Sequence, residues 1–307
     1  MRGVEREAWS AERLDASVFA SRSTPSTLLH PGVDHTPGWN WDPSVTAALV
    51  GTLVLFGLGL RRRGFPRAGR MTWARVGAFL TGLAALVAAI ISPLDQHAEQ
   101  QFSLHMVQHM ILIVIAAPLL IAARPGATLL LGLPLSFSRA LGRIWRRLHG
   151  VQSRLRWLES PALAWVVHAT TLWLWHIPGP FEAALEIRWV HDLEHLTFLG
   201  TAMWFWWTIA QLIRSRSVKV GVAFFSLFTM ALQSGLLGVL ITFSRVPWYP
   251  TYIELAPLLH ITALADQQFA GVIMWVPAGT IYFAAAIGIL YRWLRDDSVV
   301  SWTSNPG

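Results

Sequence analysis

Seven apolar runs of about 17 to 24 residues dominate this sequence. They lie at about 44–60, 73–92, 104–123, 161–177, 192–213, 220–243 and 269–291. A helix needs about 20 predominantly apolar residues to cross roughly 30 Å of hydrocarbon, so each run is long enough, or nearly so, to span a bilayer. We therefore predict an all-α integral membrane protein, a bundle of about seven transmembrane helices.

The composition supports a membrane as the solvent of this chain. Of its 307 residues, 54% are hydrophobic and only 13% are charged, which leaves too little polar surface to enclose a soluble domain of this size. Seventeen tryptophans suit the headgroup level of a bilayer, where an indole can bury its ring and use its N–H. A tryptophan-rich core is the alternative.

The basic residues predict the orientation of the helices. Lys and Arg number six after the first run, none after the second, seven after the third, one after the fourth, three after the fifth and one after the sixth. The positive-inside rule places the odd-numbered connections in the cytoplasm, with the N-terminus outside and the C-terminus inside. Because these residues lie in short loops and form no single patch, the net charge of +7 does not indicate nucleic-acid binding.

The predicted domain organisation is simple. Residues 1–43 form a polar extracytoplasmic tail with no evident signal-peptide core, residues 44–294 the transmembrane domain, and residues 295–307 a cytoplasmic tail. The third connection has apolar residues at roughly helical spacing between arginines: Leu141, Ile144, Trp145, Leu148, Leu155 and Leu158. We expect it to lie on the inner membrane surface and bind anionic lipid, with partner docking as the alternative.

Five histidines gather at the predicted outer ends of the helices: His105, His109, His176, His191 and His195. The first two and the last two are each spaced four residues apart, so each pair can present its imidazoles on one helix face. Imidazole is the commonest protein ligand for zinc, copper and non-haem iron. The pattern predicts a metal site; the alternative is a set of interfacial histidines that hydrogen-bond water and lipid phosphates.

Cysteine is absent, which excludes thiolate metal sites, so any metal must be held by nitrogen, carboxylate or thioether. Met106, Met110 and Met274 could supply thioether ligands to copper(I) or simply pack. Asp266, before the last run, is either a ligand or an N-terminal helix carboxylate. Asp192 and Glu194 could accept hydrogen bonds from the imidazoles.

Two further features have alternative interpretations. His168 lies about 12 Å deeper than His176, and is either the inner end of a metal or proton path or a packing histidine bonded to a neighbouring helix, for instance to Gln233 or Ser234. The proline- and aromatic-rich loop from Phe243 to Tyr252 is either a lid over the histidines or part of an interfacial aromatic belt.

Several motifs in a fixed order resemble those of the CtaG family of cytochrome c oxidase assembly factors. They are H-M-V-Q-H-M, A-A-P-L-L, L-W-L-W-H-I-P, V-H-D-L-E-H-L-T-F, S-G-L-L-G, P-W-Y-P-T-Y and D-Q-Q-F-A-G-V-I-M-W-V-P. The similarity runs from about Trp41 to Leu294, and the first forty residues have no counterpart in it.

The resemblance implies a multi-pass protein of the bacterial plasma membrane that is not an enzyme. It would help to assemble a haem-copper oxidase at the stage of copper insertion or subunit maturation, with oxidase subunits as partners, copper as the metal and a copper chaperone as a further candidate partner. The family's histidine and acidic positions would fall on His105, His109, His176, His191, His195 and Asp266, which we expect to be the metal ligands. Alternatives from other classes are a membrane haem-binding or redox protein with paired histidines as axial ligands, and a transporter.

Overall fold

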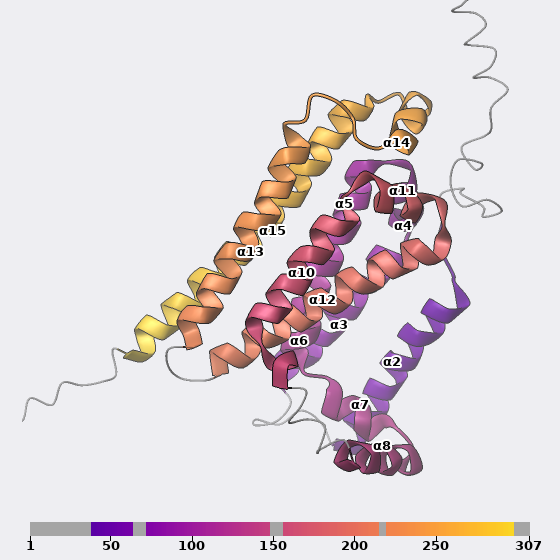
Figure 1. The fold of residues 1–307 in the computed structure, drawn as a ribbon. Coiled ribbons are helices and arrows are strands. Elements are labelled where there is room, and N and C mark those ends of the chain that lie inside the picture. Colours follow the sequence, from indigo (N-terminus) through magenta and orange to yellow (C-terminus); the bar gives the residue numbers. More distant parts are fainter. Residues whose placement is uncertain (1–37, 64–71, 148–155, 215–218, 298–307) are drawn as a thin grey trace, which may run out of the picture.

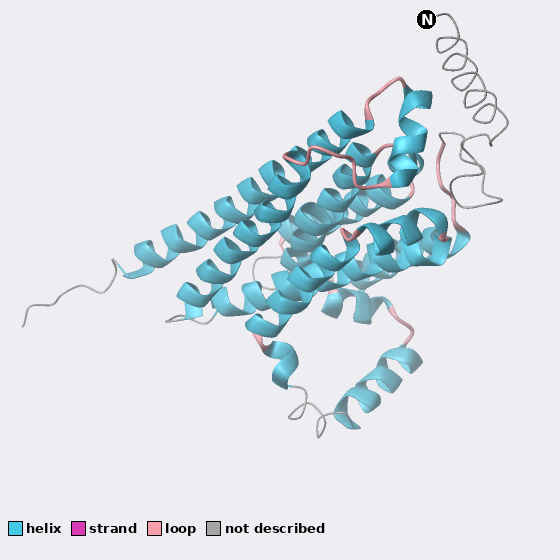
Figure 2. Ribbon diagram, turned by 45° about the horizontal axis from the view of Figure 1, so that its top comes forward, coloured by secondary structure: helices cyan, strands magenta, loops and turns pink. Residues whose placement is uncertain are grey.

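The computed structural model describes residues 38–63, 72–147, 156–214 and 219–297, and this part of the chain contains helices and no strand (Figures 1 and 2). In chain order these are α2 Pro43–Arg63, α3 Trp73–Ile90, α4 Pro93–Gln100, α5 Phe102–Met110, the π-helix η2 Ile111–Ala116, α6 Ala117–Ala123, α7 Gly126–Gly132, α8 Leu135–Arg147, η3 Arg156–Glu159, α10 Pro161–Trp175, α11 Pro178–Glu186, α12 Arg188–Arg214, α13 Lys219–Thr242, α14 Pro250–Leu255, η4 Ala256–Leu259 and α15 Ala263–Asp297. Most of the predicted N-terminal tail and the end of the predicted C-terminal tail lie outside the described residues.

Six helices in the described part of the chain are long and apolar enough to cross a membrane. They are Pro43–Arg62, Trp73–Ile90, Phe102–Ala123, Arg188–Arg214, Val220–Thr242 and Ala263–Arg295. The fourth predicted span corresponds to α10, which has 15 residues and is shorter than the roughly 20 that a straight crossing requires. The all-helical, multi-pass membrane architecture is therefore confirmed, whereas the seventh span and the orientation of the termini remain predictions.

The third span is one rod with an irregular middle. After α5 the chain widens into the π-helix η2 and then continues as α6, which ends at Arg124 in the left-handed conformation (φ 49°). π-helical segments are rare and frequently lie beside functional sites. Here the wider turn begins two residues after His109.

Helices α13 and α15 form a closely packed pair, which Figure 1 shows side by side. A Cβ atom added at Gly238 would lie 2.7 Å from the Cβ of Trp275, and one added at Gly271 would lie 2.7 Å from the carbonyl oxygen of Gly238. Without Cβ atoms at these two positions the backbones can approach closely, as in other membrane helix pairs with small residues at their interface.

The two ends of the bundle are different. The short helices α4, α11 and α14 gather at one end, together with the first turns of α5 and α12, whereas α7 and α8 lie at the opposite end (Figure 1). We call the first the histidine end and the second the arginine end. On α8 the side chains of Leu135, Phe137, Leu141 and Ile144 are exposed, but Leu148 and Leu155 of the predicted surface segment lie outside the described residues.

Candidate metal centre

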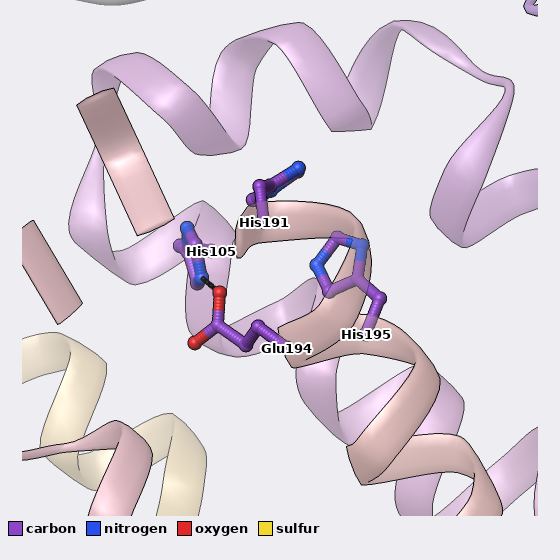
Figure 3. Close-up of side chains that lie close together, drawn as sticks. All are labelled: His105, His191, Glu194 and His195. Atoms are coloured by element: carbon purple, nitrogen blue, oxygen red, sulfur yellow. Dashed lines mark ion pairs between the residues drawn. The ribbon is translucent and has the colours of Figure 1, made fainter. Parts of the chain in front are cut away.

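Two helices bring four potential ligands together at the histidine end. His105 lies near the start of α5, and His191, Glu194 and His195 lie on the first two turns of α12 (Figure 3). Positions three and four residues apart share a helix face, so the three side chains from α12 point toward α5 together. All four residues are buried.

The geometry of these four residues suits a single metal ion. One ligand atom from each lies within 4.8 Å of the others. The Nε2 atom of His105 is 3.5 Å from Oε2 of Glu194, and the ring centroids of His191 and His195 are 4.2 Å apart. Three imidazoles and one carboxylate are a ligand set that zinc, copper and iron accept.

Buried polar atoms in the cluster lack hydrogen-bond partners. Neither carboxylate oxygen of Glu194 accepts a hydrogen bond from the described residues. The Nε2 atom of His195 also forms no hydrogen bond with them. Burying a carboxylate is costly unless its charge is compensated. A cation bound between these groups would supply the compensation, so the residues fit a metal.

The other two predicted histidines lie against this cluster. His109 has Nε2 3.7 Å from Oε1 of Glu194, and its ring centroid is 4.3 Å from that of His105. His176, which follows α10, has its ring centroid 6.4 Å from that of His109. Its Nδ1 donates to the carbonyl oxygen of Leu172 over 2.6 Å, which leaves Nε2 as the nitrogen without a hydrogen bond. The structure thus brings all five predicted histidines together in one buried group.

Asp266 does not lie among these potential ligands. Its carboxylate accepts hydrogen bonds from the backbone N–H groups of Phe102 (2.8 Å) and Ser103 (3.3 Å), and from the side chain of Gln101. The first N–H groups of a helix have no partner within the helix. Asp266, which belongs to α15, therefore caps α5 from a distant part of the chain. The cap fixes the helix turn that carries His105.

The two glutamines after Asp266 hold the loop from Phe243 to Tyr252. Gln267 accepts a hydrogen bond from the backbone N–H of Trp248 over 2.7 Å, and Gln268 donates to the carbonyl oxygen of Ser244 over 3.1 Å. The start of α15 therefore connects the loop to the same helix turn that caps α5.

That loop and α14 cover the histidines with two buried tyrosines. The hydroxyl of Tyr249 donates to the carbonyl oxygen of His176 over 3.0 Å. The hydroxyl of Tyr252 donates to the carbonyl oxygen of Ala98 over 2.9 Å and lies 3.3 Å from Nδ1 of His105. This arrangement supports the lid interpretation of the loop.

Tyr252 gives Nδ1 of His105 a hydrogen-bond partner. A phenol has one proton, and the carbonyl oxygen of Ala98 receives it, so Nδ1 of His105 must be the donor in the second hydrogen bond. Burial, followed by the negative charge of Glu194, raises the pKa of Tyr252 and keeps this hydroxyl protonated. The other ring nitrogen of His105, Nε2, then faces Oε2 of Glu194 at 3.5 Å, which is the position that a metal ligand in this cluster requires.

The methionines and His168 have packing roles in the structure. Met106, Met110 and Met274 are buried in the main hydrophobic core and are not among the four potential ligands. His168 pairs its Nδ1 with the hydroxyl of Thr201 on α12 over 2.9 Å. The prediction that His168 bonds to Gln233 or Ser234 is wrong, because the face of α10 that carries His168 packs on α12. Gln233 instead accepts a hydrogen bond from Trp173, and Ser234 donates one to the carbonyl oxygen of Met230.

Of the two acidic residues in V-H-D-L-E-H-L-T-F, only Glu194 belongs to the site. Asp192 is exposed and pairs with Arg188 over 3.4 Å. A residue one position from His191 is rotated by about 100° around the helix, which takes Asp192 off the ligand face.

Sequence reasoning missed a buried polar group beside the site. On α4, Asp95 is buried and accepts 2.7 Å hydrogen bonds from the side-chain amides of Asn40 and Gln108. Gln108 also donates to the carbonyl oxygen of Ala89, so this group ties the segment before α2 to α3, α4 and α5. Gln108, as the one polar residue between the two histidines of H-M-V-Q-H-M, was the available signal.

The fold and the site together define a polytopic helical membrane protein with a buried histidine-carboxylate cluster at one end. The chain belongs to the family of cytochrome c oxidase caa3 assembly factors (Caa3_CtaG), whose sequence model matches residues 54–296. The family predicted from the motifs is thereby confirmed.

The chain is also similar to mycobacterial proteins. The uncharacterized proteins Mb0105 of Mycobacterium bovis and MT0111 of Mycobacterium tuberculosis are each 25% identical to it over 290 residues, and ML1998 of Mycobacterium leprae is 26% identical. Each alignment covers 86% of this chain but only 40% of the relative, so the chain spans well under half the length of these curated relatives. No solved structure matches the chain.

Proposed function

We propose that this protein assists the assembly of a haem-copper cytochrome c oxidase by holding copper, as cargo, at the histidine cluster, in copper insertion or subunit maturation. The observation that carries the proposal is the convergence of His105, His191, Glu194 and His195 in a buried group whose ligand atoms lie within 4.8 Å of one another. Family membership supplies the oxidase as the assembled partner.

Each residue has a defined part in this proposal. The three imidazoles supply nitrogen ligands, and Glu194 supplies one negative charge against the charge of the ion. This ligand set suits copper(II) or zinc better than copper(I), which favours thioether and thiolate sulfur. His109, 3.7 Å from Glu194, can exchange for a primary ligand during loading or release. The protein catalyses no reaction in this role.

The proposed location is the bacterial plasma membrane, with the histidine end facing outward. The alternation of basic residues supports this orientation, since the arginine-rich connections then lie in the cytoplasm. An oxidase subunit would receive its copper at this outer face, either directly from the cluster or through a copper chaperone.

The packing of the imidazoles favours an ion over haem. The rings of His105, His109, His191 and His195 have neighbouring centroids 4.2 to 6.2 Å apart and lie against Phe181 and Phe198. A macrocycle would have to push them apart. The visible spectrum of the purified protein discriminates between the two, because haem would give a Soret band and a bound copper ion would not.

Metal analysis of the purified protein tests the proposal. The wild type, loaded with copper and dialysed, should retain about one ion per chain, and the variant with both His105→Ala and His195→Ala should retain almost none. Asp192→Asn is the matched control, because Asp192 is adjacent to His191 in the chain but is exposed and pairs with Arg188 off the ligand face. This variant should retain the ion.

Two results would contradict the proposal. One is a wild type that retains no more metal than the double variant. The other is a loss of metal in Asp192→Asn with full retention in the histidine variant, which would place the site at Asp192. A separate experiment addresses the partner: oxidase subunits that co-purify with the wild type should have empty copper centres in cells that carry only the double variant.

A further inference from the structure

A groove of about 360 Å³ runs between α6, α12 and α15 near the arginine end. Its wall is apolar and includes Ile121 from α6, Ile209 and Ile213 from α12, and Ile289 from α15. Arg292 is its one charged lining residue. In a bilayer a groove between helices with such a wall accepts an acyl chain, because an empty one would forfeit dispersion contacts along its length.

Besides Arg292, which lines this groove, two arginines lie next to its lining residues in the chain: Arg124 is two residues after Ala122, and Arg214 directly follows Ile213. Arg124 follows α6 directly, Arg214 is the last residue of α12, and Arg292 lies on the last turns of α15. Within the described ranges none of the three forms an ion pair with a carboxylate. The groove therefore has an apolar wall and cationic groups at one end.

Two of these arginines, Arg124 and Arg214, are close enough to repel each other. Partial burial, and then the positive charges of Arg214 and Arg75, lower the pKa of Arg124. Like charges from separate helix ends are unfavourable unless an anion lies between them. An anionic group bound beside these arginines would reduce the repulsion.

We propose that this groove binds one anionic phospholipid, with an acyl chain along α6, α12 and α15 and the phosphate among Arg124, Arg214 and Arg292. Arginine matches phosphate because its guanidinium donates two hydrogen bonds in a fixed plane. The cytoplasmic leaflet, where we expect this end to lie, carries anionic lipid. The site is independent of the metal cluster at the opposite end.

Lipid titration of the full-length protein in detergent tests the proposal. Phosphatidylglycerol should remain bound as one molecule in native mass spectrometry and raise the thermal unfolding midpoint. Phosphatidylcholine with the same acyl chains should do neither. The triple variant Arg124→Gln, Arg214→Gln and Arg292→Gln should bind phosphatidylglycerol at least tenfold more weakly.

Two further variants separate the groove from diffuse attraction. Arg139→Gln with Arg143→Gln removes the same kind of charge from α8, where we expect only diffuse attraction to anionic lipid, and should leave the one tightly held lipid molecule bound. Gly288→Leu should weaken binding although all arginines remain, because Gly288 lines the groove and a Cβ added there meets no atom within 4 Å. This variant fills the groove without a steric clash at its Cβ, so a failure of the triple variant to fold leaves the test intact.

Three results would overturn the proposal. If phosphatidylcholine is retained as well as phosphatidylglycerol, the arginines do not select an anionic headgroup. An equal loss in the α8 variant would indicate diffuse attraction only. An equal rise of the unfolding midpoint with inorganic phosphate, unaffected by Gly288→Leu, would indicate a free-anion site without an acyl chain.

Discussion

The hydroxyl of Tyr252 orients the imidazole of His105 through a hydrogen bond with Nδ1. Tyr252→Phe removes the acceptor for the Nδ1 proton of His105, so the imidazole is free to rotate and to change tautomer. We expect copper(II) affinity to fall about tenfold, the lower end of the range for partners of metal-bound histidines. Competition titration with a chelator of known affinity measures it.

Tyr249→Phe is the control for that variant. In the wild type, the hydroxyl of Tyr249 donates a hydrogen bond to the backbone oxygen of His176 and to no ligand imidazole. Its removal should therefore change the copper affinity by less than twofold. The copper(II) absorption spectrum should shift in Tyr252→Phe alone. Equal weakening in both variants, with unaltered spectra, would reduce Tyr252 to a packing residue of the lid.

We expect the burial of Asp95 to make the stability of the protein depend on pH. Burial, opposed by hydrogen bonds from Asn40 and Gln108, raises the pKa of Asp95 from 3.8 to about 6, and the nearby charge of Glu99 adds to the rise. The folded state then binds the proton more tightly than the unfolded state, so this contribution to stability is present below about pH 4 and lost as the pH rises to about 6. Asp95→Asn should flatten this part of the profile.

The measurement is the thermal unfolding midpoint in detergent between pH 4 and pH 7. Asp42→Asn serves as the control, because hydrogen bonds from Ser44 and Val45 lower the pKa of Asp42 and keep it ionised throughout this range. An Asp95→Asn profile that coincides with that of the wild type would show that Asp95 is ionised in the folded protein.

Residue positions were predictable where helix periodicity alone decides them. The pairs His105 with His109 and His191 with His195 follow from a spacing of four, and the structure places each pair on one face. Asp266 is the N-terminal helix carboxylate of α15 that the sequence offered as one alternative, but its cap on α5 could not be predicted, because those partners are 163 and 164 residues away in the chain. The partner of His168 depends on how α10 is rotated against α12, which no local pattern encodes.

At the scale of elements, the contact between α13 and α15 depends on glycine. Gly238→Ala places a Cβ 2.7 Å from that of Trp275 and 3.1 Å from the carbonyl oxygen of Gly271, so the helices must move apart. Overpacking of this kind costs about 1–3 kcal/mol. Thermal unfolding in detergent should show a lower midpoint.

Gly235→Ala, three residues earlier on α13, is the matched control. A Cβ at Gly235 meets no atom within 4 Å, and alanine is the better helix former by about 1 kcal/mol. Its unfolding midpoint should be equal to that of the wild type or higher. A comparable loss in both variants would show that the effect lies in the helix backbone and not in the contact.

The long helices could be predicted from hydropathy, and the short ones could not. Each predicted run contains a helix with similar bounds, since apolar length is a local property. Helices α4, α11 and α14 lie in connections, have six to nine residues and owe their stability to tertiary contacts. The pattern predicted a full span for α10, but the helix stops before Pro178, where the chain turns into α11.

For the whole molecule, the absence of native cysteine makes the orientation directly measurable. Asp192→Cys places a thiol at the histidine end, where the side chain is 59% exposed, and Ser136→Cys places one at the arginine end. A membrane-impermeant maleimide should label the first in intact cells and the second only after lysis. Labelling in the reverse order would invert the proposed topology and move the metal cluster to the cytoplasmic face.

The loop from Phe243 to Tyr252, together with α14, affects how long an ion would stay bound at the cluster. Every potential ligand is buried, and Tyr252 of α14 lies against one of them, His105, next to the loop that Gln267 and Gln268 hold. An ion held there cannot dissociate into water until that segment opens, so its residence time is set by the opening rate of the loop and only secondarily by the strength of coordination. Under the proposed function, an acceptor subunit that displaces the loop would accelerate transfer without competing for the ion, and the ion would remain bound until such an acceptor arrives.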